Sequence, residues 1–275
     1  MTRFGRVAVT MGLALSGWAA PAAAQYAAPP MATSAAVGEN YHIQAAAGLW
    51  SPALTGVVAS EQLGIVGTKI DFTKDLKFQD TRFSDLRFEL KAGKRNKLFA
   101  QYVPITYSSD TTLTRDIVFN GQKFSANLPI QSQFDWKVWR LGYELDLISM
   151  DRFFLGGTVE ARVTDFAVTL KAPGDTEFTK ATGPLPAYGG IARAYLLPHL
   201  SVTASVSGFS LWDSLATKLD ATGNYVDMDF YATYNINNYI GVQGGYRKMS
   251  LTVTLKKDYG DMEYAGIWFG GVVRY

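Results

Sequence analysis

The last eleven residues decide the fold, and they read Ala265-Gly266-Ile267-Trp268-Phe269-Gly270-Gly271-Val272-Val273-Arg274-Tyr275. Side chains on a β-strand point alternately to its two faces. One face of this segment therefore carries Ile267, Phe269, Val273 and Tyr275, opposite Gly266, Trp268, Gly270 and Arg274. The alternation predicts a strand with one apolar face.

The same period of two recurs back along the chain as far as Tyr41, and no window of useful length fits the helical period. Between 200 and 207, for example, Leu, Val, Ala and Val alternate with Ser, Thr, Ser and Ser. Turn-forming residues separate such segments. The pattern predicts ten strands, over about 41–50, 83–92, 98–108, 131–147, 153–171, 184–196, 200–211, 225–236, 239–256 and 262–275.

The predicted connections alternate between short and long. The short ones are 93–97, 149–152, 197–199 and 237–238, and the long ones are 51–82, 109–130, 172–183 and 212–224. Such alternation is typical of bacterial barrels, which have short turns at the periplasmic end and long loops outside the cell. We therefore predict an all-β fold: a single antiparallel up-and-down transmembrane β-barrel of about ten strands, with eight or twelve as alternatives.

The composition fits a barrel that lies in lipid. Aromatic residues make up 13% of the chain, charged residues only 18%, and there are 26 glycines. Beyond the N-terminal segment no stretch is long and apolar enough for a membrane-spanning helix. A closed barrel satisfies every backbone hydrogen bond in lipid without such a stretch.

The N-terminus has the pattern of a secretory signal peptide. Arg3 and Arg6 precede an apolar run over 7–20, and the small residues of 21–24 predict cleavage between Ala24 and Gln25. We assign residues 1–24 to the signal, 25–40 to a flexible Ala/Pro-rich periplasmic lead-in, and 41–275 to the barrel.

Charge and cysteine content narrow the choice of partners. Removing the two arginines of the signal from 26 basic residues leaves 24, which equals the 24 acidic residues. A neutral mature chain argues against nucleic acid as a partner. The chain has no cysteine, so burial and hydrogen bonding must stabilise it without disulfides.

The terminal segment 265–275 resembles the C-terminal recognition strand of Gram-negative outer-membrane proteins, the broad class that includes OmpA-like and OmpW-like barrels. In that class the barrel-assembly machinery reads a terminal aromatic residue and alternating hydrophobic residues, here Ile267, Phe269, Val273 and Tyr275. The segment Gly67-Thr68-Lys69-Ile70-Asp71, followed by Asp75-Leu76, is similar to a pattern in members of no assigned activity. The resemblance implies an outer-membrane location, with lipid and lipopolysaccharide as partners.

The sequence offers little for catalysis or metal binding. His42 and His199 both fall at the predicted periplasmic end, away from the outer leaflet, where the enzymes of this class place their histidines. The acidic spacing around Asp220 and Asp227 has its glycine misplaced for a calcium loop. We predict no catalytic residues, no metal and no cofactor.

The strongest candidates for functional residues are the charged residues on the inward faces of the predicted strands. Unpaired charges inside a narrow barrel are costly, so we expect these residues to pair into a hydrogen-bonded network, with a narrow path for water or ions as the alternative. The set is Arg87, Glu89, Lys91, Arg140, Glu144, Glu160, Arg162, Arg193, Asp227, Asp229, Arg247 and Arg274, of which Arg193 depends on the unsettled parity of its strand.

On the outer face we expect Tyr143, Phe153, Tyr234 and Tyr275 to form an aromatic girdle at the periplasmic interface. In the loop 109–130, Asn120-Gly121 predicts a hairpin that extends outside the membrane.

Taken together, these features of the sequence predict a non-enzymatic barrel with a structural or surface-interaction role. The alternatives are a small-solute diffusion channel and a lipid-modifying enzyme or protease.

Overall fold

The computed structural model describes residues 36–61, 67–93, 95–210, 221–255 and 258–275. The predicted signal peptide and most of the predicted lead-in lie outside the described residues. No helix in the described part of the chain is long and apolar enough to cross a membrane.

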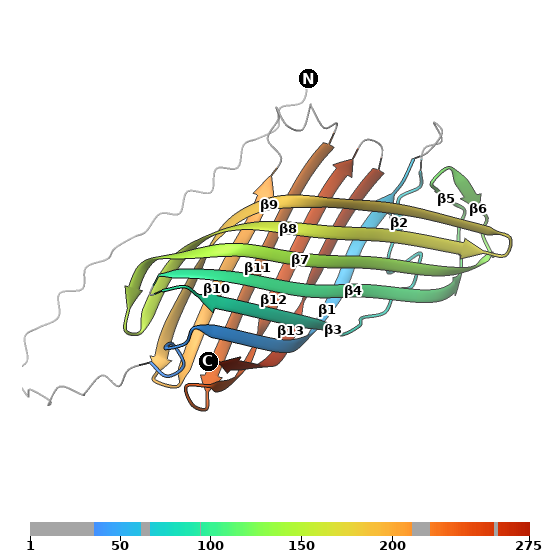
Figure 1. The fold of residues 1–275 in the computed structure, drawn as a ribbon. Coiled ribbons are helices and arrows are strands. Elements are labelled where there is room, and N and C mark those ends of the chain that lie inside the picture. Colours follow the sequence, from blue (N-terminus) through green and yellow to red (C-terminus); the bar gives the residue numbers. More distant parts are fainter. Residues whose placement is uncertain (1–35, 62–66, 94, 211–220, 256–257) are drawn as a thin grey trace, which may run out of the picture. The chain divides into compact units, whose positions relative to one another are not determined.

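The described residues form a closed antiparallel β-barrel (Figure 1). Each barrel strand pairs with its neighbour in sequence, and the first and last strands pair from Gln44–Arg274 to Ala59–Tyr259. The prediction of a ten-stranded up-and-down barrel is confirmed. Its strands are β1 (Ile43–Ala59), β3 (Phe83–Lys91), β4 (Asn96–Thr112), β7 (Pro129–Met150), β8 (Phe153–Ala172), β9 (Asp175–Leu197), β10 (Leu200–Ser210), β11 (Ala221–Asn235), β12 (Ile240–Leu255) and β13 (Asp258–Arg274).

Several strands are longer than predicted at the long-loop end, the barrel end opposite the short turns. The region 172–183 was predicted to be a loop, and this is wrong. It forms the ends of β8 and β9, joined by the tight turn Pro173-Gly174. Gly174 has a φ of +90°, a conformation that glycine adopts without strain. β1 likewise runs to Ala59, nine residues past the predicted end at residue 50.

The predicted hairpin at Asn120-Gly121 is present, but it does not extend away from the barrel. β5 (Ile117–Phe119) pairs with β6 (Gln122–Phe124), and both turn residues have positive φ, as the turn of a two-residue hairpin requires. Ile117, Phe119 and Phe124 are buried, and Asn120 donates a hydrogen bond to Glu177 near the tip of β9. The hairpin therefore packs across the long-loop end, where Figure 1 shows it beside the far ends of the long strands.

The outer surface of the barrel is divided into an apolar belt and a polar wall. Exposed large apolar side chains occur on all ten barrel strands, and apart from Phe178 near the tip of β9 they lie toward the short-turn end. Along β7 the outward residues are Gln131, Gln133, Asp135 and Lys137, followed by Trp139, Leu141, Tyr143 and Leu145. We call the apolar part the outer belt and the part beyond it the upper wall.

The interior shows the opposite division. Inside the upper wall lies an apolar core, which includes Trp50, Phe134, Trp136 and Tyr264. The segment after β1 contributes to it: β2 (Ile70–Asp71) pairs with β1, and Phe72, Leu76 and Phe78 are almost fully buried. Behind the outer belt, the interior is polar and charged instead. These polar residues form the candidate site.

Candidate functional site: a charged network inside the barrel

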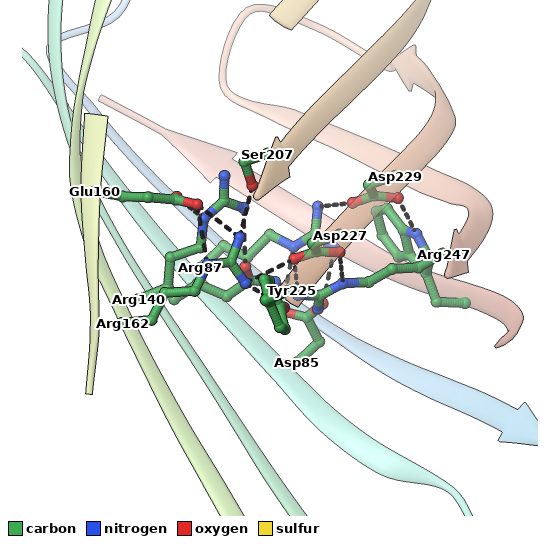
Figure 2. Close-up of polar contacts among 12 residues, drawn as sticks. Asp85, Arg87, Arg140, Glu160, Arg162, Ser207, Tyr225, Asp227, Asp229 and Arg247 are labelled. Atoms are coloured by element: carbon green, nitrogen blue, oxygen red, sulfur yellow. Dashed lines mark hydrogen bonds and ion pairs between the residues drawn. The ribbon is translucent and has the colours of Figure 1, made fainter. Parts of the chain in front are cut away.

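Four arginines and four carboxylates form one network at mid-height in the barrel (Figure 2). They project inward from β3, β7, β8, β11 and β12, because alternate residues of each strand face the lumen. The members are Arg87, Arg140, Arg162, Arg247, Asp85, Glu160, Asp227 and Asp229. The positive and negative charges are equal in number, which is what burial in a narrow lumen requires.

Asp227 lies between two arginines. Arg162 Nη1 donates to its Oδ2 at 3.0 Å, and Arg247 donates from Nε at 3.0 Å and from Nη2 at 2.8 Å. Arg247 also reaches Asp85 at 3.2 Å. All four side chains are nearly inaccessible to solvent. Because Asp227 bonds both arginines, it joins the part of the network around Arg162 to the part around Arg247. Hydrogen bonds between charged groups are stronger than those between neutral groups.

Arg162 and Arg140 share Glu160. Arg162 donates to Glu160 Oε1 at 2.6 Å and to Ser207 Oγ at 2.6 Å, and it also bonds Tyr225, whose ring it faces. Arg140 contacts the other oxygen, Glu160 Oε2. Every carboxylate oxygen of Glu160 therefore has a cationic partner, which offsets the cost of its burial.

Arg87 completes the opposite side. Its Nη2 lies 2.7 Å from Asp85, and its Nη1 lies 2.9 Å from Asp229. Its guanidinium carbon is 4.2 Å from the centre of the Trp268 ring, and Trp268 Nε1 donates to Asp229 at 2.8 Å. The aromatic ring thus supports both members of an ion pair.

A second group of charges lies nearer the short-turn end. Lys97 Nζ is 2.6 Å from Glu144 and 3.1 Å from Asp146. Tyr41 donates a hydrogen bond to Glu89, and Arg274 bonds Gln44 at 2.6 Å and Asn235 at 2.8 Å.

Arg193 on β9 faces the lumen and lies 2.7 Å from Glu39. Although burial alone would raise it, the pKa of Glu39 is lowered to about 2 because Arg193 and Lys91 stabilise the carboxylate. This contact places residues of the predicted lead-in against the end of the barrel.

The structure places the predicted charged residues inside the barrel and brings them into two neighbouring groups. Sequence reasoning missed Asp85, Lys97, Asp146 and Glu39. Asp85 and Asp146 share the parity of Arg87 and Glu144 on the same strands, so alternation alone was sufficient to find them. Lys97 was assigned to a turn and Glu39 to the lead-in, so no pattern pointed to them.

Neither histidine lies with the network. His199 is in the turn after β9, where its Nδ1 is 2.6 Å from the Asn235 carbonyl oxygen, and exposed His42 precedes β1. Within the described ranges, no three His, Cys, Asp or Glu side chains are arranged to hold a metal ion. The chemistry of the network is that of paired, buried ions.

Of the comparisons with known proteins, the one with solved structures bears on the fold, and none of them resolves an activity. No protein-family model matches the chain, and no curated protein matches it. Among solved structures, the outer membrane protease OmpT from Escherichia coli superimposes with a TM-score of 0.54 at 9% identity, covering 85% of this chain and 97% of that one. This chain has the fold of an outer-membrane β-barrel.

Two other matches are looser. Ail of Yersinia pestis, in complex with a heparin analogue, has 10% identity and a TM-score of 0.37, over 83% of this chain and 99% of that one. The Pseudomonas putida toluene transporter TodX has 8% identity and a TM-score of 0.35, over 85% and 90%. At such identities the likeness concerns the fold alone.

Proposed function

We propose that this chain spans the outer membrane of a Gram-negative bacterium as a closed, non-catalytic barrel with a structural or surface-interaction role. The observation that carries the proposal is its filled interior. The charged network occupies the part behind the outer belt, and the apolar core with the hairpin β5–β6 occupies the part inside the upper wall. A diffusion channel instead needs a continuous wet path through the lumen.

The outer belt supports the membrane location. On β7 it runs from Trp139 to Ile148, and both residues are well exposed. Ten residues at about 3.3 Å each, tilted by roughly 40°, span about 25 Å, which matches the apolar band of membrane barrels. We infer that the belt contacts lipid, and that lipopolysaccharide contacts its border with the upper wall.

The C-terminal strand supports recognition by the assembly machinery. Ile267, Phe269 and Val273 are 66%, 55% and 55% exposed on the outer face of β13, and Tyr275 is 84% exposed. Of the predicted girdle, Tyr143 and Tyr234 are also exposed on the outer face, and Phe153 is half-buried. These side chains are accessible to a partner during insertion, and to lipid afterwards.

The upper wall is the part that we assign to interaction with other molecules. Its outer face is hydrophilic, with side-chain bonds across strands such as Thr106–Asp135 at 2.8 Å and Thr182–Asp165 at 2.8 Å. A shallow groove of about 500 Å3 lies at the tips of β4, β7 and β8 and includes Asp110, Gln131 and Lys171.

Planar-bilayer recording of the refolded mature chain tests the proposal, after the heat-dependent gel shift has confirmed a folded barrel. We expect a folded protein without discrete current steps. Discrete steps that change in Arg162→Ala would favour the channel. An altered lipid A mass profile on expression in a Gram-negative host would favour an enzyme instead.

A further inference from the structure

A cavity of about 90 Å3 lies inside the barrel between the central network and the short-turn end. It has room for several water molecules, at roughly 10–15 Å3 for each. Its lining is largely polar and includes Arg87, Glu89, Arg140, Glu144, Thr158 and Asp229. We call this cavity the chamber.

Two lining groups have unused hydrogen-bonding capacity. Thr158 is 8% exposed, and its Oγ1 is buried without a hydrogen-bond partner among the described residues. Glu89 accepts a hydrogen bond from Tyr41, but no described cation lies within ion-pair distance of its carboxylate. A buried hydroxyl and a carboxylate of this kind cost free energy unless water or another polar ligand satisfies them. The lining therefore favours polar contents.

Val37–Tyr41, which we call the strap, crosses the short-turn end beside the chamber. Val37 N donates to the Pro198 carbonyl at 2.8 Å, and its own carbonyl accepts from Asn235 at 2.6 Å. Glu39 pairs with Arg193 at 2.7 Å and accepts a bond from Tyr195 at 2.8 Å. The strap is thus fixed at several points along its length.

Tyr41 connects the strap to the chamber itself. It is 4% exposed, and its hydroxyl bonds Glu89, a chamber-lining residue. The cations of Lys91 and Arg274 lie 4.9 Å and 5.7 Å from the centre of its ring. Toward the other end of the barrel, the Arg162–Asp227–Arg247 group and the apolar core fill the interior. The side of the strap is therefore the shorter way in.

We propose that the chamber is a binding site for water and small polar solutes, entered from the periplasmic end and closed there by the strap. This goes beyond the closed barrel described under Proposed function, because a barrel that conducts nothing can still take up solutes from one side. The two ideas are tested by different measurements.

The absence of cysteine from the chain makes thiol labelling a clean test. Thr158→Cys places a thiol in the chamber. Val159→Cys, one residue along, places it on the lipid-facing side, and Val168→Cys places it in the apolar core, because Val159 is 59% and Val168 0% exposed. A small cationic methanethiosulfonate is added to each full mature chain, refolded in lipid vesicles, and the labelling rate is measured by mass spectrometry.

We expect Thr158→Cys to react slowly, and about ten- to a hundredfold faster when Glu39→Gln and Tyr41→Phe weaken the strap, since the first removes the charge that pairs with Arg193 and the second removes the hydroxyl that bonds the Glu89 carboxylate. Val168→Cys should stay unreactive in both backgrounds, and the rate for Val159→Cys should not depend on the strap. If Thr158→Cys does not fold, Ser205→Cys replaces it, because Ser205 also lines the chamber.

Two results would overturn the proposal. A chamber thiol as inert as Val168→Cys in both backgrounds would mean that the chamber is closed to polar solutes. Equal rates with and without the strap changes would mean that the strap does not close it. Neither result bears on bilayer current, so a failure here leaves the proposed function to its own test.

Discussion

The most specific prediction from the charged network concerns the substitution of Asp227. This side chain is 3% exposed and accepts three hydrogen bonds, one from Arg162 and two from Arg247, at 2.8–3.0 Å. Asp227→Asn keeps the shape but removes the charge, and it replaces one acceptor oxygen by an amide that faces a guanidinium. Arg162 keeps Glu160, whereas Arg247 keeps only the 3.2 Å contact with Asp85 among the described carboxylates.

Breaking a buried ion pair by removing one partner costs about 3–5 kcal/mol, because the other charge remains buried and unpaired. We expect Asp227→Asn to lower the free energy of unfolding by about that amount. The assay is urea unfolding of the refolded barrel in lipid vesicles, followed by tryptophan fluorescence and the gel shift. Glu263→Gln is the matched control. Glu263 pairs with Lys248 at 2.8 Å on the outer face, where both side chains are over 40% exposed, so its loss should cost less than about 1 kcal/mol.

A double-mutant cycle separates the ion pair from other effects of the substitution. Arg247→Met removes the arginine that loses its two closest hydrogen bonds in Asp227→Asn, so the two changes together should cost clearly less than their sum. Equal stability of Asp227→Asn and the Glu263→Gln control would refute the reasoning. It would mean that water in the lumen screens these charges, and that the interior is wetter than the buried network indicates.

Three further predictions concern other parts of the chain. Phe269→Arg, on the outer face of β13, should destabilise the barrel in vesicles by about 2–4 kcal/mol, measured by the same urea titration, and a loss below about 0.5 kcal/mol would contradict the proposed lipid contact there. The pKa of Asp75 lies below its usual value, because the hydrogen bonds from Arg115 and a backbone amide outweigh the effect of burial. The stability that this carboxylate gives is therefore complete above the ordinary aspartate pKa of about 3.9 and is lost as the pH falls through the lowered value. Hydrogen-exchange protection over 67–82, measured relative to the intrinsic exchange rate at each pH, should fall at acid pH in the wild type but be low already at neutral pH in Asp75→Asn, and identical profiles would count against the contact. Tyr275→Ala should lower the yield of folded barrel in cells while leaving refolding into vesicles intact, and an unchanged cellular yield would argue against recognition of this residue.

The strand order was predictable because it depends on local alternation and turn chemistry, which lie within a few residues of each other. The segment 200–206 and the Asn120-Gly121 turn are examples. The ends of the strands were not predictable in the same way. Beyond Val163 on β8 the outward residues become polar and the inward residues Val168 and Leu170 apolar, so a search for apolar outer faces loses the strand there.

The pairing of residues within the charged network could not be predicted from the sequence either. Alternation shows that Arg162 and Asp227 face the lumen, but their contact joins residues 65 positions apart on strands that are not neighbours. Which inward residues meet depends on the stagger of the strands around the barrel, and the stagger is a property of closure as a whole. The strap was missed for a different reason: the composition around Glu39 resembles that of a linker, and its contacts with Arg193 and Tyr195 exist only in the folded barrel.

Along a single strand the apolar side chains change from the inner to the outer face of the barrel, and this change indicates which part of the barrel carries the proposed function. On β7 the apolar side chains face inward from Ile130 to Val138 and outward from Trp139 onward, the pattern expected if water surrounds the first part and lipid the second, as we propose. The part of β7 whose apolar side chains face inward, residues 129–138, is roughly 30 Å long at about 3.4 Å per residue. This length is similar to the length of strand that crosses a bilayer, and it is additional to the outer belt. A barrel that served only to cross the membrane would end near residue 138. The added half has its own hydrophobic core and a hairpin packed across its end, so the surface-interaction role that we propose is better assigned to this half than to the lumen.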